Sequence, residues 1–259
     1  MNMPVPSYAL YENALDSLGL DLIRRGWGFA KGADLKATFG LDEQSWQGFA
    51  AFWQRLSLDG HMADGGTYRQ RRYSAFEINY SASSLVRMPH GPYEQASYIN
   101  KLNGGIARHF PPLEEGMVSH PFFLDLLFSM ARIFDCAAGG SGTWDVRLHP
   151  YRICSSELEQ GKPTPEGLHR DGVDYIVMML IGRSGVTGGV TRVTDPLGNT
   201  LFETTLAEPL DIIVGDDHQI MHEVSPLHCA KAGVQGHRDA LVIAFTRLPA
   251  NRKPHHEPD

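Results

Sequence analysis

A series of short β-strand patterns in the second half of this 259-residue chain restricts the fold more than any other feature. Turn-forming residues separate the segments at Gly182–Gly185, Pro196–Asn199 and Gly215–Asp217, and no helical pattern lies between them. Many short strands spaced by about ten residues are typical of β-sandwiches and jelly rolls. The predicted strands are 144–149, 174–182, 189–195, 200–206, 210–215, 219–224 and 240–248.

The first part of the chain has helical periodicity instead. Apolar residues recur at helical spacing in three segments, and Asp42 is a suitable N-cap for the second of them. Residues 60–100, rich in glycine and tyrosine, indicate a hairpin region. The predicted helices are 8–25, 41–56 and 122–134.

No linker-like stretch separates the helical part from the β part. We therefore predict one domain over residues 1–259, with a helical front and support at 1–140 and a jelly-roll core at 144–248. The predicted fold class is mainly β with α. It is a double-stranded β-helix (jelly roll) on which N-terminal helices pack.

Composition excludes several classes of function. The formal net charge of −7 disfavours general binding to nucleic acid or anionic lipid. The basic cluster Arg69, Arg71 and Arg72 is expected to be a solvated strand edge. The three cysteines include no CxxC pair, and the N-terminus lacks a basic segment followed by an apolar one, so a cytoplasmic protein is expected. No run of apolar residues is long enough for a membrane span.

Three side chains form a candidate metal site. His169 and Asp171 lie two residues apart where a predicted strand begins, so both are expected on one face. His222, in a later predicted strand, supplies the third ligand. Two histidines and one carboxylate leave coordination positions open, the arrangement for iron(II) that binds a cosubstrate and O₂. A second triplet, His237-Arg238-Asp239, has no later histidine within the predicted strands.

Residues 144–248 contain, in order, EGLHRDGVDY, GGVTRV, DIIVGDDHQIMHEVSPL and GHRDALVIAF. This series resembles the bacterial 2-oxoglutarate- and iron-dependent dioxygenases typified by L-isoleucine 4-hydroxylase, which hydroxylate free aliphatic amino acids. A relative in that family is named as a biofilm and stress-response factor. The resemblance implies a jelly-roll core that binds Fe(II), 2-oxoglutarate and O₂. It also implies that His169, Asp171 and His222 are both metal ligands and catalytic residues.

Arg238 falls on the family's arginine that holds the distal carboxylate of 2-oxoglutarate. The chemistry requires such a group independently, because a partly buried dicarboxylate needs a permanent cation and a guanidinium binds a carboxylate with two parallel hydrogen bonds. Strand alternation places Ala240, Val242 and Ala244 on the same face as Arg238, which leaves room for a ligand.

Five further residues are weaker candidates. Thr191 is expected to line the cosubstrate pocket. Arg147 and Arg152 are candidates to pair with the carboxylate of an amino-acid substrate, and a surface ion pair is the alternative for both. Asp174 and Tyr175 are candidates near the substrate or behind a metal ligand, and an exposed strand position is the alternative for Asp174.

The predicted function is hydroxylation or sulfoxidation of a free L-amino acid, a small-molecule partner, with an aliphatic or thioether side chain. Two other functions stay open. One is a cupin-like metal oxygenase that does not use 2-oxoglutarate, and the other is a jelly-roll sensor or binding module without catalysis. A homodimer is possible.

Overall fold

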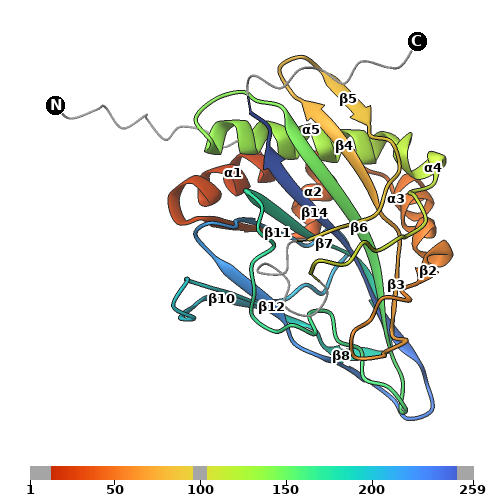
Figure 1. The fold of residues 1–259 in the computed structure, drawn as a ribbon. Helices are drawn as coiled ribbons and strands as arrows, with labels where there is room; N and C mark the ends of the chain where they lie inside the picture. The colour runs from red at the N-terminus through yellow and green to blue at the C-terminus, as the bar shows by residue number, and fades with distance from the viewer. Residues whose placement is uncertain (1–12, 96–103, 250–259) are drawn as a thin grey trace.

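The computed structural model describes residues 13–95 and 104–249, and Figure 1 shows their arrangement. The part of the predicted first helix before residue 13 lies outside the described residues. The helices are α1 (Ala14–Arg25), α2 (Gly32–Thr38), α3 (Glu43–Ala50), the 3-10 helix η1 (Ala51–Arg55), α4 (Glu115–Val118) and α5 (Pro121–Ala137). None of the helices in these ranges is long and apolar enough to cross a membrane.

Strands occur in both halves of the chain. Those of the first half are β1 (Trp27–Ala30), β2 (Ser57–Leu58), β3 (Arg69–Arg71), β4 (Ser74–Asn79) and β5 (Ser84–Arg87). Those of the second half are β6 (Trp144–Ser155), β7 (Tyr175–Ser184), β8 (Val186–Gly188), β9 (Val190–Thr194), β10 (Thr200–Thr205), β11 (Ile212–Asp216), β12 (Met221–Val224), β13 (Leu227–Cys229) and β14 (Gly236–Arg247).

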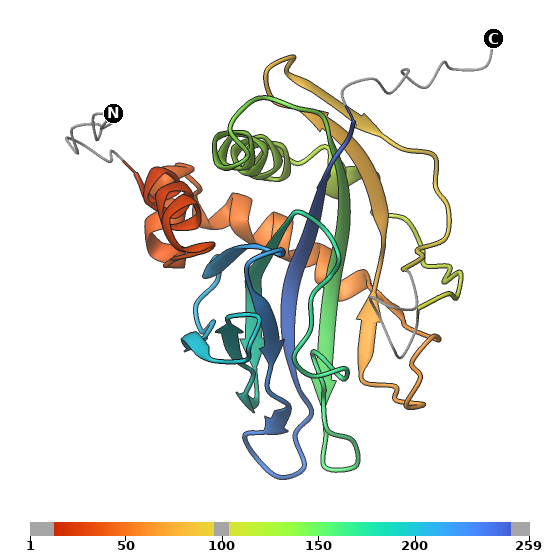
Figure 2. The same ribbon diagram turned by 60° about the vertical axis from the view of Figure 1, so that its left-hand side comes forward.

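Antiparallel pairing joins these strands into one large sheet and two small ones. The main sheet has the order β1-β11-β7-β14-β6-β3-β2, with β4 paired to β6 and β5 paired to β4. The minor sheets are β10-β9-β12 and β13-β8. The long strands β6 and β14 run side by side through the main sheet (Figure 2). This mainly β architecture confirms the predicted jelly roll with N-terminal helices.

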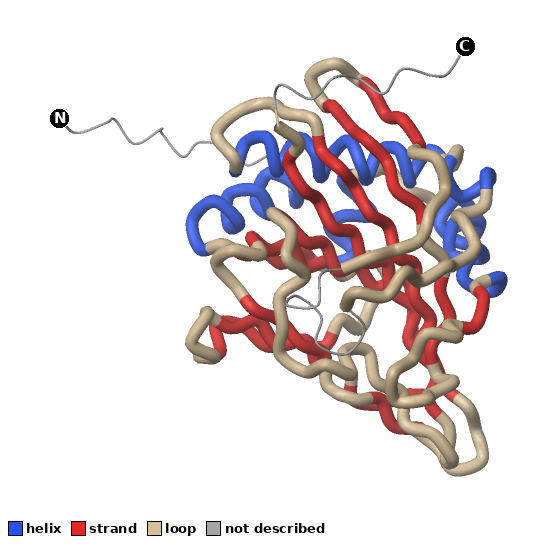
Figure 3. The backbone as a smooth tube through the Cα atoms, viewed as in Figure 1, coloured by secondary structure: helices blue, strands red, loops and turns tan. Residues whose placement is uncertain are grey.

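The helices cover one face of the main sheet (Figure 3). Tyr175, Val177 and Met179 of β7 belong to the large core shared with α1, α3 and α5, whereas Ile176 and Met178 belong to a second core that includes residues of β9 and β11. Because side chains alternate along a strand, a strand buried on both faces is a continuous apolar run.

The same alternation decides which residues of β6 and β14 face away from the helices. Trp144, Val146 and Leu148 of β6 pack into the core with α5. The alternate positions, from Asp145 through Arg147 and His149 to Tyr151, therefore face the opposite side, where the metal triad lies. On β14 the same rule turns Arg238, Ala240 and Val242 to that side.

Most predicted elements are confirmed within a few residues. Asp42 caps α3 by accepting a hydrogen bond from the Ser45 backbone N–H at 2.7 Å. The elements that were missed are short: the helices α2 and α4 and the strands β1, β2, β8 and β13. The strand β1 pairs with β11, so the N-terminal part of the chain supplies an edge of the main sheet as well as helices.

Candidate metal centre and the cavities around it

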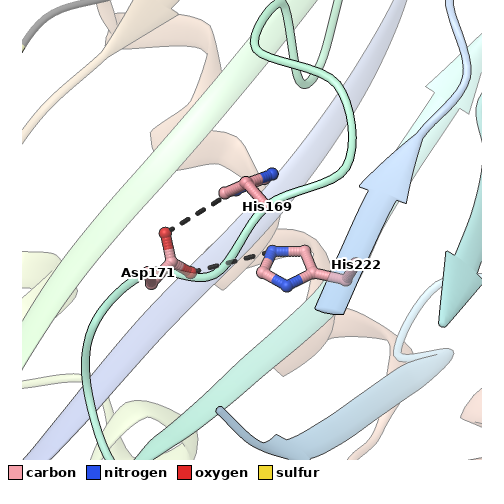
Figure 4. Close-up of side chains that lie close together, drawn as sticks. All are labelled: His169, Asp171 and His222. Carbon is pink, nitrogen blue, oxygen red and sulfur yellow. Dashed lines mark ion pairs between the residues drawn. The ribbon is translucent and has the colours of Figure 1, made fainter. Parts of the chain in front are cut away.

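His169, Asp171 and His222 come together from a loop and a short strand (Figure 4). His222 lies on β12, whereas His169 and Asp171 lie in the loop between β6 and β7. The expectation that this pair begins a strand is therefore wrong. The loop is instead held against β12 by two backbone hydrogen bonds, from His169 N–H to His222 O (3.1 Å) and from His222 N–H to His169 O (3.0 Å).

The ligand atoms of the three side chains all lie within 4.8 Å of one another. Nε2 of His169 is 3.8 Å from Oδ1 of Asp171, and Nε2 of His222 is 3.7 Å from Oδ2 of Asp171. Nδ1 of His169 is 2.8 Å from the Gly167 carbonyl oxygen and donates its proton there, which leaves the Nε2 lone pair for a metal. This arrangement fits a divalent cation such as iron(II).

A second carboxylate, Asp217, holds the loop that carries Asp171. Its oxygens accept hydrogen bonds from the backbone N–H groups of Asp171 (3.1 Å), Gly172 (2.7 Å) and Val173 (3.1 Å). Gly172 has a φ of +74°, a conformation that glycine adopts without steric cost. Asp217 was not predicted as a site residue, because its contacts with this loop lie 44 to 46 residues away in sequence.

Charge at the site also fits a metal. Burial raises the pKa of the Asp171 carboxyl, and His169 opposes this effect. Burial, with His169 nearby, holds the pKa of His222 well below its ordinary value, so His222 is neutral and able to ligate. Burial also disfavours the charged form of His169, but Asp171 and Glu166 outweigh it and raise the pKa of His169.

A cavity of about 90 Å³, the Arg238 cavity, opens beside the triad. His169, Asp171 and His222 line it at one side and Arg238 lines it at another. Arg238 is 4% exposed, and its Nε has no hydrogen-bond partner among the described residues. Burial lowers the pKa of Arg238 to about 10, so the guanidinium still carries its charge at neutral pH. A buried guanidinium whose Nε has no hydrogen-bond partner among the described residues fits an anionic ligand.

A larger cavity of about 270 Å³, the Arg147 cavity, reaches Asp171 from the other side. Its polar lining includes Arg147 and Asp145, whose Nε and Oδ2 are 3.0 Å apart. Its apolar lining includes Val173, Val242 and Ala244. Asp171, Tyr151 and Val242 line both cavities, so two ligands can approach one metal from different directions.

Of the five weaker candidates, Arg147 is the one that lines either of these two cavities. Arg152 lies on the opposite face of β6, where Nε and Nη2 each donate a 2.7 Å hydrogen bond to Asp239. Tyr175 stacks on Phe134 of α5 with ring centroids 4.6 Å apart, inside the helix-facing core. These contacts correct the expectation that Arg152 and Tyr175 face the substrate.

The positions of Asp174 and Thr191 also differ from those expected. Asp174 accepts hydrogen bonds from the Arg247 backbone N–H (2.6 Å) and from Nε2 of His218 (2.9 Å), so it ties the start of β7 to the end of β14. Thr191 is fully buried, and its hydroxyl has no partner among the described residues. Neither residue is among those that line the two cavities.

The basic cluster on β3 is buried, and the expectation of a solvated edge is wrong for two of its three arginines. Arg69 is 7% exposed and Arg71 is 1% exposed. Arg69 Nε donates to Asp59 at 2.7 Å, and Arg71 donates to Nδ1 of His149. No local sequence pattern indicates this burial, because Asp59 and His149 lie 10 and 78 residues from the arginines that they contact.

The jelly roll and its two-histidine, one-carboxylate triad define the class as non-haem iron(II) dioxygenases that use 2-oxoglutarate. A family model described as 2OG-Fe dioxygenase matches residues 50–244, which is most of the chain. The chain belongs to this family, as the resemblance of residues 144–248 predicted.

Three relatives support the assignment. A bsmA homologue from Methylobium petroleophilum PM1 is 34% identical over 90% of this chain and 93% of its own, with a TM-score of 0.81. The 3(1)-hydroxy-L-isoleucine 4-dioxygenase of Pantoea ananatis (strain AJ13355) is 23% identical over 87% of this chain and 94% of its own length. IDO from Bacillus thuringiensis, at 17% identity, covers 91% of this chain and 100% of its own with a TM-score of 0.74, which supports the fold.

Proposed function

We propose that this dioxygenase hydroxylates or sulfoxidises a free L-amino acid with an aliphatic or thioether side chain. The name of the Pantoea ananatis relative describes an enzyme that acts on a hydroxylated isoleucine, which supports an amino-acid substrate here. At 23% identity the particular amino acid does not transfer from that relative to this chain.

The pairing of opposite charges with an apolar wall in the Arg147 cavity carries the proposal. A free amino acid presents a carboxylate, an ammonium and a side chain on one carbon. Arg147 is the group for the carboxylate, and Asp145, already beside Arg147, is the group for the ammonium. Val242 and Ala244 leave an apolar space for the side chain next to Asp171.

In this proposal the Arg238 cavity holds 2-oxoglutarate. Bound iron(II) and 2-oxoglutarate supply the activation of dioxygen, with release of succinate and CO₂. His169, Asp171 and His222 hold the metal, and Arg238 holds the distal carboxylate. Thr191 is buried and lines neither cavity, so it has no role in this proposal.

The two alternative functions explain the site less well than a 2-oxoglutarate-dependent dioxygenase does. A metal oxygenase that does not use 2-oxoglutarate has no ligand for a buried guanidinium whose Nε has no partner among the described residues. A binding module without catalysis has no need for a two-histidine, one-carboxylate group that lines one cavity and shares Asp171 with a second.

The test begins with protein purified without oxygen and supplied with iron(II), ascorbate and 2-oxoglutarate. Air is then admitted, succinate is measured with each of the twenty amino acids, and mass spectrometry detects a product one oxygen atom heavier. We expect one or a few amino acids to stimulate succinate formation. If none does so in protein shown to contain iron, the proposed substrate class is wrong.

The variant Arg147→Gln tests the carboxylate site. Because a hydrogen-bonded ion pair with substrate is lost, we expect KM for the amino acid to rise roughly 10- to 100-fold. Arg192→Gln is a matched control, since Arg192 also pairs with a carboxylate, that of Glu223 at 2.7 Å, but lines neither cavity. Equal KM changes in the two variants would exclude Arg147 as the substrate-binding cation.

A further inference from the structure

His149 is a buried histidine that lines the Arg147 cavity and has no role in the function proposed so far. It lies on β6, is 3% exposed and lines the cavity with Arg147 and Asp171. Its ring stacks between Tyr73 (centroids 5.1 Å apart) and Tyr151 (5.9 Å), and Tyr93 meets it edge to face at 4.5 Å. Three aromatic neighbours fix the plane of the imidazole.

Arg71 fixes the tautomer of this imidazole. A guanidinium has only hydrogen-bond donors, so its contact with Nδ1 of His149 requires Nδ1 to be the acceptor. The proton of the neutral ring therefore lies on Nε2. Burial, together with Arg71 and Arg147, lowers the pKa of His149 well below its ordinary value, so the ring stays neutral. Asp59 anchors Arg71, with Oδ2 and Nη1 3.9 Å apart.

The Nε2–H group of His149 is left without an acceptor. It is buried and has no hydrogen-bond partner among the described residues, and buried donors are rarely left unpaired. Arg71 reaches the ring from β3 on one side of β6, whereas Val242, the β14 partner of His149, lies on the other side. Because the two ring nitrogens point in roughly opposite directions, Nε2 is turned toward the side where Val242 and Asp171 line the cavity.

We propose that His149 is a specificity-determining residue that donates its Nε2–H hydrogen bond to the carboxylate of the substrate. The inference rests on the amino-acid function proposed above. Arg147 lies two residues away on the same face of β6, so the cation and the neutral donor can each take one carboxylate oxygen. A cation alone attracts a carboxylate, and a second donor of fixed direction sets its orientation. The orientation then decides which carbon or sulfur of the substrate is nearest the metal.

The variants His149→Phe and His149→Gln separate the donor from the shape of the ring. Phenylalanine keeps the aromatic packing but removes both the acceptor for Arg71 and the donor for substrate. Glutamine keeps an acceptor and a donor. If loss of the acceptor leaves His149→Phe unstable, the double variant R71M/H149F removes the buried guanidinium as well and serves the same test.

The assay compares kcat/KM for the amino acid identified in the screen with kcat/KM for the amine that lacks its carboxylate. We expect His149→Phe to raise KM for the amino acid roughly 10- to 100-fold and to reduce the preference for amino acid over amine by a similar factor. His149→Gln should recover most of this loss. KM for 2-oxoglutarate should change by less than about threefold, because the Arg238 cavity has its own cation.

Two results overturn the inference, and they are distinguishable. If the wild type oxidises an amino acid but His149→Phe keeps the same preference over the amine, His149 does not contact the carboxylate and the proposed function stands. If no amino acid stimulates the wild type, the proposed function fails and this inference fails with it.

Discussion

The substitution Asp217→Asn tests whether the protein alone holds the loop of Asp171 in position for iron before the metal binds. Asp217 is 2% exposed, and its two oxygens accept three backbone hydrogen bonds from the loop that carries Asp171. An amide has one accepting oxygen, so it keeps at most the two bonds that Oδ2 accepts from Gly172 and Val173. The NH₂ group then faces the N–H of Asp171, donor against donor.

The magnitude follows from that loss. One hydrogen bond to a charged acceptor contributes about 1.5–3 kcal/mol, and we expect the free energy of unfolding to fall by about this amount. The amide also displaces the backbone of a metal ligand. Loss of such an outer contact costs about 10- to 100-fold in metal affinity. The assays are urea unfolding of the metal-free protein and titration with iron(II) without oxygen.

Asp195→Asn is the matched control. Asp195 also accepts backbone hydrogen bonds, from Leu197 and Asn199 at 2.9 Å each, but it lies in the turn between β9 and β10. We expect its iron affinity to stay within twofold of the wild type. If Asp217→Asn also binds iron as the wild type does, the loop is ordered by the metal alone and the reasoning above is wrong.

Three further results are expected. Arg238→Met should raise KM for 2-oxoglutarate roughly 100-fold, and Arg238→Lys should recover only part of it because an ammonium lacks the planar fork; an unchanged KM would exclude this site. Tyr175→Phe should leave KM for substrate unchanged, because the ring packs on Phe134, and a steady-state KM measurement checks this. The hydrogen bond that His218 Nε2–H donates to Asp174 raises the pKa of His218, so this pair stabilises the fold fully below about pH 6.5 and less as pH rises through the raised pKa. Melting curves of wild type and His218→Asn should therefore differ more at pH 5.5 than at pH 8.5.

The metal triad was predictable because its chemistry restricts residue types strongly. A His-x-Asp triplet followed by a histidine in a later predicted strand leaves few alternatives, and the triplet at His237 has no such later histidine. The resemblance of residues 144–248 supports the same choice. The loop position of His169 and Asp171 was not predictable. It depends on Asp217 and on backbone pairing with β12, which are tertiary contacts without a local sequence pattern.

The errors among the weaker candidates have a simple geometric cause. Arg147 and Arg152 are five positions apart on one strand, an odd offset, so they face opposite sides of the sheet. Because both residues are arginines, residue type alone does not show which of them faces the cavity. Tyr175 faces the helices for the same reason, because it follows the alternation of β7 that places Val177 in the helix-facing core.

The buried arginines show where sequence reasoning stops. A run of arginines beside tyrosines normally indicates a solvated face, because burying a charge without a partner is costly. On β3 the cost is offset by Asp59, buried itself, and by the acceptor Nδ1 of His149. These partners lie 10 and 78 residues away in sequence, so no local pattern reports them.

The two ligand-binding arginines of the proposed site differ in a way that suits their ligands. Arg238 is buried, and its Nε has no hydrogen-bond partner among the described residues, so its cavity suits an anion whichever substrate is oxidised. The side chain of Arg147 is 39% exposed and already paired with Asp145. A zwitterionic substrate would replace this ion pair with two, one from its carboxylate to Arg147 and one from its ammonium to Asp145, at a small net cost in free energy. In the proposed function, the stronger binding therefore belongs to 2-oxoglutarate at Arg238. Discrimination among amino acids would then rest on directional contacts and on the apolar wall formed by Val242 and Ala244.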